Sequence, residues 1–389
     1  MRWSFPIGRI SGISLRLHVT FLALLLFIGY STYRELNLLM ALWSVGFICA
    51  VFGCIILHEL GHSLVAQQFG IEVRSITLLP IGGVAALKSI PQNPWHEIAI
   101  TLAGPLVNAV IALLLLPVIG LPKELLLVYL PHDFHAFLTA LLKANLTLFL
   151  FNFIPAFPMD GGRLVRAVLA LVLPYHRATS IAALIGQAIA IIFIMAGLTG
   201  SQLLPGVIPF WLIIIGVFIF LGAEAEERLV RTRTALADCD VAAVMMRNFV
   251  SLTPTDSCEH ATRLLFQTGQ DDFPVLADDR FLGSVSRADI LKTTGPVETI
   301  MDQTVPPVSP HDRLVQVYDE ILAEGWGSVP VLEDDRLVGW LTNENINRYL
   351  AVRRGGAGRK PALPPGTATV RPVAPPPPPA KPAPPTAPA

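Results

Sequence analysis

The chain has 389 residues, of which 53% are hydrophobic and 15% are charged, and its mean hydropathy is +0.58. An ordinary soluble protein carries about 25% charged residues, so this composition excludes a single soluble globule. The net charge of −1 neither favours nor excludes binding to nucleic acid, and we expect no nucleic-acid partner. Charged residues are sparse up to residue 222 and dense from Glu224 to Arg354, which predicts a membrane part followed by a soluble part.

Six stretches are apolar and long enough, or nearly so, to span a membrane, which takes about 20 residues of helix. They are 18–34, 39–60, 97–119, 135–155, 179–199 and 205–223. The first stretch is short and the last two are separated only by Gly197, Gly200 and Pro205, so five or seven spans stay open. We predict a polytopic α-helical membrane protein of about six spans.

Basic residues set the predicted orientation. With six spans, most arginines and lysines near span ends lie on the side of the two termini, and only Arg34 and Lys123 lie on the other. Cytoplasmic loops carry the excess of basic residues in membrane proteins. We therefore expect a multi-pass protein of the cell membrane, with its N-terminus and its soluble half in the cytosol.

The second apolar stretch ends in the sequence His58-Glu59-Leu60-Gly61-His62. Two histidines at i and i+4 face the same side of a helix, so both can bind one metal ion. The glutamate between them is then free to act on a metal-bound water. Ionisable residues at membrane depth are costly, which favours a functional interpretation. The motif predicts one zinc ion per chain, bound by His58 and His62, with Glu59 as the catalytic residue.

Residues 73–91 follow the motif and combine β-branched residues with Pro80 and Gly82-Gly83. This composition favours a hairpin-like or looping segment over a helix. Apolar non-helical backbone beside membrane spans is tolerated where protein or a water-filled cavity receives it. We expect the segment to dip into the membrane-embedded core or to lie along it, with a surface loop as the alternative.

A third zinc ligand must come from elsewhere, because catalytic zinc takes three protein ligands and one water. Asp160 is the best candidate, since it follows the fourth span on the same predicted side of the membrane as the histidines. Pro158 and the pair Gly161-Gly162 should break the helix and let the carboxylate turn toward the metal. The alternative is a solvated aspartate in an interfacial turn.

The histidine motif, together with NFIPAFPMDGGRLVRA at 152–167, resembles the site-2 protease family of intramembrane metalloproteases. AGPLVN at 103–108 and LPIGGV at 79–84 extend the resemblance, which covers about residues 1–223. It implies that His58, His62 and Asp160 bind zinc and that Glu59 is the acid/base. For the asparagines, interhelical hydrogen bonding is the alternative to contact with substrate. The substrate-binding residues that the resemblance implies are Gly82, Gly83, Val84, Asn108, Asn145 and Asn152.

The soluble half contains an internal repeat with a constant offset, in which FPVL at 273–276 corresponds to VPVL at 329–332. Each copy predicts helix, strand, turn, strand, helix, and the two copies should pack together. The repeat resembles a pair of CBS domains, an α/β module that commonly binds adenine nucleotides. The resemblance implies nucleotide-binding residues at Ser286, Asp289, Thr342 and Asn345. Asn345 replaces the usual aspartate, and a homodimerisation module without a ligand is the alternative.

The predicted domains are a membrane-embedded metalloprotease (1–223), a linker (224–240), two CBS repeats (241–295 and 296–352) and a disordered proline-rich tail (353–389). The predicted function is cleavage of a transmembrane protein substrate among membrane lipid, regulated by adenine nucleotide. A CBS-regulated transporter of metal ions or anions is the main alternative, and a non-catalytic binding protein is the second. A transport site has no need for a glutamate between the two histidines.

Overall fold

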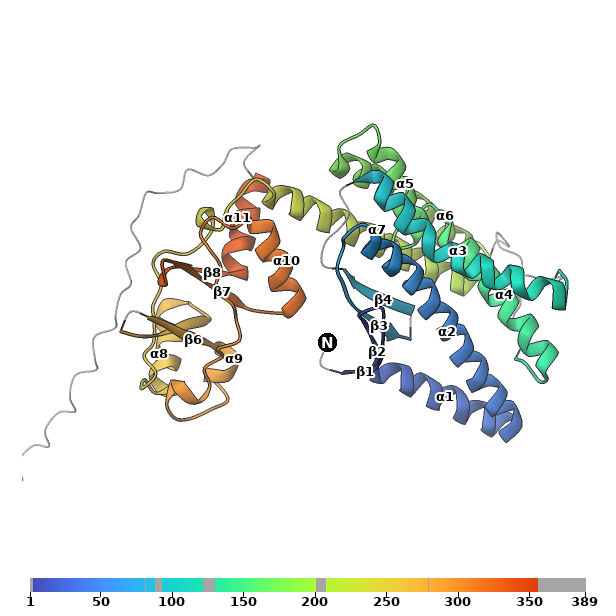
Figure 1. The fold of residues 1–389 in the computed structure, drawn as a ribbon, viewed down its shortest axis with the longest axis horizontal. Coiled ribbons are helices and arrows are strands. Elements are labelled where there is room, and N and C mark those ends of the chain that lie inside the picture. Colours follow the sequence, from blue (N-terminus) through green and yellow to red (C-terminus); the bar gives the residue numbers. More distant parts are fainter. Residues whose placement is uncertain are drawn as a thin grey trace, which may run out of the picture. The chain divides into compact units, whose positions relative to one another are not determined.

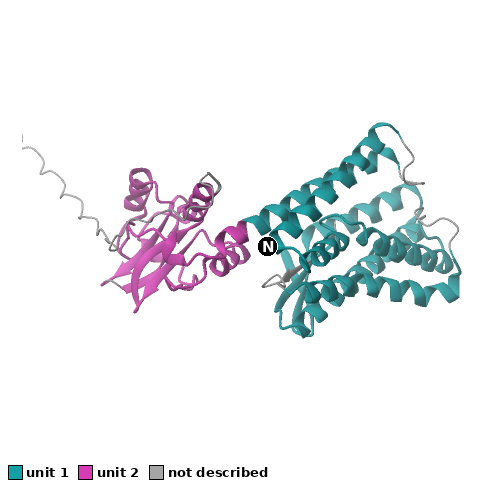
Figure 2. Ribbon diagram, turned by 90° about the horizontal axis from the view of Figure 1, so that it is seen from above, with its two compact units in different colours: residues 1–231 teal, residues 232–389 magenta. Residues whose placement is uncertain are grey.

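The computed structural model describes residues 3–80, 82–87, 93–121, 130–200, 208–278 and 280–355. The chain divides into two compact units, residues 1–231 and 232–389 (Figure 2). The elements of the first unit are β1 (Ser4–Ile10), β2 (Ile13–His18), α1 (Val19–Glu35), α2 (Leu38–Gln68), β3 (Val73–Leu79), β4 (Gly82–Leu87), α3 (Pro94–Ile119), α4 (Phe134–Asn152), α5 (Asp160–Ala170), α6 (Tyr175–Leu198) and α7 (Pro209–Leu236).

Each of the six predicted spans corresponds to one of the described helices, namely α1, α2, α3, α4, α6 and α7. Five of them are long and apolar enough to cross a membrane, and α1 is not among these five. With 17 residues, α1 falls short of the roughly 20 that a span requires. The structure therefore agrees with a polytopic helical fold but does not confirm the count of six. The short helix α5 was not predicted.

Helix α2 is central to the first unit, since it contacts α1, α3, α4 and the strands β3 and β4 (Figure 1). A buried cluster joins the sheet to α2 and α3, with Ile13 and Ile76 from the strands packed against Leu60 and Ile100 from the helices. This packing fixes the position of the histidine-bearing end of α2 relative to both the sheet and α3.

The strands form one sheet in the order β1-β2-β3-β4, with β2 and β3 parallel and the outer pairs antiparallel. Strands β3 and β4 make the hairpin that we predicted, and the rest of that segment lies outside the described residues. Strands β1 and β2 were not predicted. They are joined at Ser11 and Gly12, which both have positive φ. Such a two-residue turn is a hairpin signal that the sequence contained.

The second unit repeats its elements at a constant offset of 56 residues. Helix α8 (Cys258–Thr268) corresponds to α10 (Leu314–Glu324). Strand β5 (Asp272–Ala277) corresponds to β7 (Ser328–Glu333), and strand β6 (Arg280–Ser286) corresponds to β8 (Arg336–Thr342). The short helix α9 (Arg287–Ile290) corresponds to the start of α11 (Asn343–Gly355), and the 3-10 turns η1 (Val241–Ala243) and η2 (Val297–Thr299) correspond in the same way. The predicted order of helix, strand, turn, strand and helix is confirmed. Two buried clusters of the core each combine most of one repeat with the first residues of the other. Val241 and Val244 pack with the second repeat, and Val297 packs with the first.

Most of the predicted linker is helical, because α7 continues to Leu236. Ion pairs at i and i+4, Glu224 with Arg228 and Glu227 with Arg231, stabilise this exposed part of the helix. The division between the two units falls within α7, after Arg231. The other predicted domain boundaries stay predictions, and nearly all of the predicted tail lies outside the described residues.

Candidate metal centre

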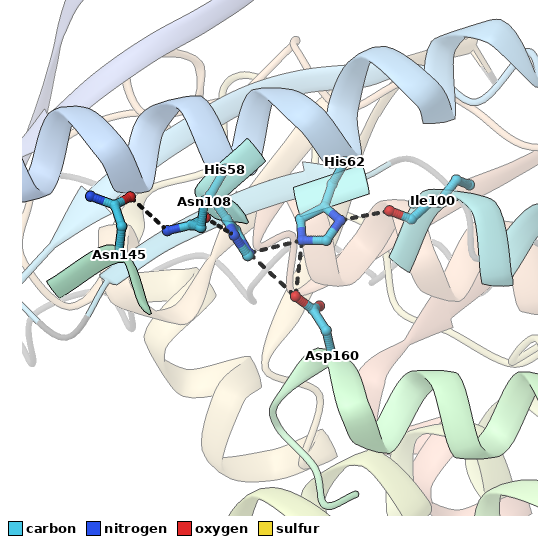
Figure 3. A network of polar contacts seen from close by, with 6 residues as sticks. All are labelled: His58, His62, Ile100, Asn108, Asn145 and Asp160. Atoms are coloured by element: carbon cyan, nitrogen blue, oxygen red, sulfur yellow. Dashed lines mark hydrogen bonds and ion pairs between the residues drawn. The ribbon is translucent and has the colours of Figure 1, made fainter. Parts of the chain in front are cut away.

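Helices α2 and α5 bring three side chains together, although 98 residues separate two of them along the chain (Figure 3). The Nε2 atoms of His58 and His62 lie 3.0 Å apart. The Asp160 Oδ2 atom lies 3.3 Å from His58 Nε2 and 3.1 Å from His62 Nε2. These are the three residues that the sequence predicted as zinc ligands, and the structure places them as a group that could hold a metal ion.

Helix α3 fixes the orientation of both histidine rings. The His62 Nδ1 atom lies 2.7 Å from the carbonyl oxygen of Ile100, which can only accept, so Nδ1 carries the proton. The His58 Nδ1 atom lies 2.7 Å from Asn108 Oδ1, and the Asn108 amide nitrogen donates in turn to Asn145 Oδ1 at 3.2 Å. Both rings therefore direct an unprotonated Nε2 toward Asp160, which is the arrangement that metal-ligating histidines show.

Two imidazole lone pairs and one carboxylate oxygen converging at this distance repel one another unless a cation lies between them. Tetrahedral zinc with bonds of about 2.0–2.1 Å separates its ligand atoms by about 3.3–3.4 Å, close to the spacing found here. The residues therefore fit zinc, and the three-ligand set leaves one position for water.

The glycines after Asp160 have a different role from the one predicted. Gly161 and Gly162 lie in the first turn of α5 and do not break it. A Cβ at Gly161 would lie 2.1 Å from the Ile154 carbonyl oxygen, and one at Gly162 would lie 2.5 Å from the Ala156 carbonyl carbon. Glycine is needed because α5 packs directly on the segment that precedes it, and this close packing places Asp160 at the centre.

Glu59 lies within electrostatic reach of both histidines and Asp160. The backbone of Gly83 in strand β4 lies against the Glu59 side chain, since a Cβ there would be 2.6 Å from Glu59 Cγ. In helix α3, a Cβ at Gly104 would lie 2.2 Å from His62 Nε2. Gly104 and the Ile100 carbonyl were not predicted as site residues, because only the packing of α3 on α2 reveals them.

The six residues predicted to bind substrate fall into two groups. Gly82 and Gly83 belong to β4, which is an edge strand of the described sheet, and the Val84 side chain lies outside the described residues. Asn108 and Asn145 have no exposed surface and form the interhelical hydrogen bonds that were the stated alternative. Asn152 ends α4 and is half-buried. A substrate-binding role stays a prediction for all six.

Replacing Asn108 with alanine should weaken zinc binding about 10- to 100-fold, because such supporting hydrogen bonds contribute that much to metal affinity. Titration with a chelating competitor measures the change. Asn152→Ala is the matched control, since Asn152 makes no described contact with the histidines, and its zinc affinity should equal that of the wild type. Equal affinities in all three proteins would contradict the orienting role of Asn108.

A cleft of about 1010 Å³ in the second unit gathers the predicted nucleotide residues of both repeats. Ser286, Thr342 and Asn345 line it, and Asp289 is joined to Ser286 by a hydrogen bond of 2.6 Å. The Thr342 hydroxyl donates to Asn345 in the same way at 2.6 Å. The cations that line the cleft are Arg287, Lys292 and Arg348, and the carboxylates that line it are Asp271, Asp272 and Glu344. Arg287 pairs with Asp271, and Arg348 pairs with Glu344. The cleft therefore offers hydroxyl groups and charges of both signs to a ligand.

One carboxyl group in the cleft is perturbed. Burial raises the pKa of Asp272, although hydrogen bonds from the Ser328 side chain and the Arg287 backbone partly offset the increase. Asp272 also lies against Gly327, where a Cβ would be 2.6 Å from its Oδ2 atom. Because the charged form is disfavoured by folding, the stability that Asp272 contributes is greatest below its unfolded pKa and decreases as the pH rises through the raised, folded value.

Comparisons with known proteins assign both units. Residues 46–131 and 129–193 match the family model of peptidase family M50. Residues 241–294 and 297–352 each match the CBS domain. A zinc metalloprotease of Methanocaldococcus jannaschii is 34% identical over 355 residues, which are 90% of this chain and 97% of that protein. A solved structure of a site-2 protease from the same organism is 36% identical, covers 58% of this chain and 96% of its own, and has a TM-score of 0.41.

Proposed function

The chain belongs to peptidase family M50, the zinc metalloproteases of the site-2 type, and carries a C-terminal CBS pair; we propose that it cleaves membrane-spanning proteins within or beside the cell membrane. The observation that carries the proposal is the convergence of His58, His62 and Asp160 on helices of a membrane-type unit. With six spans, the basic residues near the span ends support a cytosolic N-terminus and a cytosolic second unit.

The site has the groups that peptide hydrolysis requires. Zinc, when bound, lowers the pKa of its water to about 7 and polarises the scissile carbonyl. Glu59 accepts the proton of the attacking water and delivers it to the leaving amine, so one carboxylate serves first as base and then as acid. His58, His62 and Asp160 hold the metal, while Asn108 and the Ile100 carbonyl keep both rings in the productive tautomer.

Strand β4 supports a way of holding the substrate. It is an edge strand of the described sheet, and Gly83 brings its backbone against Glu59. A substrate that pairs with this edge by strand addition would lie extended beside the catalytic carboxylate. Since a transmembrane helix hides its peptide bonds, the substrate must unwind locally before it can pair. Residues that weaken the helix near the cleaved bond should therefore favour cleavage.

Cleavage of a single-span substrate in lipid vesicles tests the proposed function. The purified protein should cleave it, lose activity to a chelator and regain activity with one equivalent of zinc. A helix-weakening Gly-Pro pair near the cleaved bond should raise kcat/KM. Zinc binding without cleavage of any membrane-spanning substrate, combined with cleavage of unfolded soluble peptides, would contradict the membrane-substrate proposal while leaving the protease activity intact.

The CBS pair supports regulation by an adenine nucleotide. Its cleft combines hydroxyl groups, three carboxylates and three cations, which offer partners for the hydroxyls of ribose and for phosphate. Asp289 and Asn345 occupy equivalent positions in the two repeats, so the two half-sites differ in the charge of this residue. Pairing of two copies through the CBS domains also stays a prediction.

Exchanging these two residues tests the nucleotide site. An ionised acceptor gains about 1 kcal/mol over a neutral one, or about fivefold in affinity. Asp289→Asn should therefore weaken ATP binding about fivefold, and Asn345→Asp should strengthen it by a similar factor. Calorimetry on the full chain measures both, with Asp278→Asn, an exposed residue outside the cleft lining, as a control that should match the wild type. Absence of ATP, ADP and AMP binding by the folded protein would leave the CBS pair without a nucleotide role.

A further inference from the structure

A buried charged cluster lies beside the metal centre and takes no part in the chemistry described above. The guanidinium group of Arg166 on α5 donates to Glu97 on α3, with its Nε at 2.8 Å, and its Nη1 donates to Glu226 on α7 at 2.5 Å. Arg166 is 2% exposed and Glu97 is 3% exposed. The guanidinium group also lies 5.1 Å from the ring centres of Phe157 and Tyr175. Residues from four helices, α3, α5, α6 and α7, therefore meet at one arginine.

Stability alone does not explain such a cluster. Removing charges from water costs about as much as a buried ion pair regains, and apolar residues of similar volume often serve equally well. Burial lowers the pKa of Arg166, but Glu97, Tyr175 and Glu226 raise it by more, so the guanidinium group stays charged. A fork of fixed N–H donors holds its partners in a defined geometry. The cluster is thus suited to setting the positions of helices.

The helix α3 connects the cluster to the histidines. Glu97, Ile100, Gly104 and Asn108 lie at i, i+3, i+7 and i+11, which places them on one face of the helix. The Ile100 carbonyl accepts from His62, and Asn108 accepts from His58. On the same face, Glu97 binds Arg166 of the helix that begins with Asp160. One face of α3 therefore fixes the orientation of both histidine rings and the position of α5, the helix that carries the third ligand.

The helix α7 completes the support from the other side. A Cβ at Gly222 would lie 2.6 Å from Pro158 Cδ, so α7 packs directly on the segment before Asp160. One turn later, Glu226 binds Arg166. The side chain of Glu226 is 21% exposed, in contrast to 3% for Arg166, so it is the member of the cluster that can be replaced with the least damage to the core.

We propose that Arg166 and Glu226 are positioning residues of the zinc centre, because they hold the helix of Asp160 between α3 and α7 at the distance that lets Asp160 meet the histidines. The inference concerns the metal centre alone and is independent of the identity of the substrate or of a nucleotide. It assigns a role to α7, a helix that carries none of the zinc ligands.

The test is the zinc affinity of Glu226→Ala in the full chain, measured by chelator competition. We expect the dissociation constant to rise about tenfold, the lower end of the range for groups that support metal ligands. Glu226→Gln keeps an acceptor for Arg166 and should restore most of the loss. The matched control is Glu224→Ala on the same helix, whose exposed ion pair with Arg228 lies outside the cluster and whose zinc affinity should not change.

Two further measurements separate positioning from a general loss of structure. The visible spectrum of the Co²⁺-substituted protein should change in Glu226→Ala and remain that of the wild type in Glu224→Ala, because this spectrum reports ligand geometry. Saturating zinc should restore activity. A zinc dissociation constant within twofold of the wild type in Glu226→Ala, or equal weakening in both alanine variants, overturns the proposal. If Glu226→Ala does not fold, Glu226→Gln decides, with about threefold weakening expected and an unchanged affinity overturning it.

Discussion

Replacing Glu59 with glutamine should slow peptide cleavage at least 100-fold and leave zinc in place. Glutamine has nearly the same size but can neither accept the proton of the attacking water nor deliver it to the leaving amine. Positioned acid/base groups contribute about 10²- to 10⁴-fold to rate, so kcat should fall within that range. None of the three predicted ligands is altered, so both proteins should contain about one zinc ion per chain. Elemental analysis combined with cleavage of a transmembrane substrate measures both quantities.

Glu35→Gln is a suitable control, since Glu35 is exposed at the end of α1 and its replacement should change neither quantity. Zinc in the wild type and in Glu59→Gln without cleavage by either would point to the wrong substrate or to a missing activator. Absence of zinc from both folded proteins would reject the metal site. That result would favour the two alternative functions, a transporter or a non-catalytic binding protein.

Replacing Gly104 with alanine should remove zinc without altering any ligand. The added methyl group would lie 2.2 Å from His62 Nε2, the atom that faces Asp160, so the imidazole ring or the whole of α3 must move. The same movement strains the hydrogen bond from His62 to the Ile100 carbonyl. Because a ligand is displaced, and not only a group that supports one, we expect zinc affinity to fall about 100-fold or more.

Gly53→Ala makes the same change on α2, where a Cβ meets no atom within 4 Å, and it should bind zinc normally. Chelator competition and a thermal melt of the metal-free proteins separate loss of zinc from loss of fold. Full zinc affinity in Gly104→Ala would show that α3 can move away from α2 with little loss of free energy. In that case the close contact of Gly104 with His62 would not define the site.

The metal centre could be predicted from the sequence because its evidence is local. The i and i+4 spacing of His58 and His62 sets their common face, and counting spans placed Asp160 on the same side of the membrane. The CBS repeat could be predicted for a similar reason, since the constant offset between matching residues of the two copies is visible in the sequence alone. In both cases the prediction required only helix geometry or self-similarity within the chain.

Contacts between helices could not be predicted. Gly104 against His62, Gly83 against Glu59 and Gly222 against Pro158 depend on how closely two backbones approach, which a single sequence does not state. The pair Gly161-Gly162 shows the same limit, because glycine suits both a broken helix and a tightly packed one. In the sequence, Arg166 is one of several basic residues near span ends, and only the structure shows that it is buried between two carboxylates.

The distance of 98 residues between His62 and Asp160 along the chain has a consequence for biosynthesis. Ribosomes add about 5–20 residues per second, so roughly 5–20 s pass between the synthesis of the second histidine and that of the aspartate. During this interval the nascent chain carries Glu59 and both histidines without the third ligand. The site with three ligands can therefore form only after α5 has been made and has packed against α3.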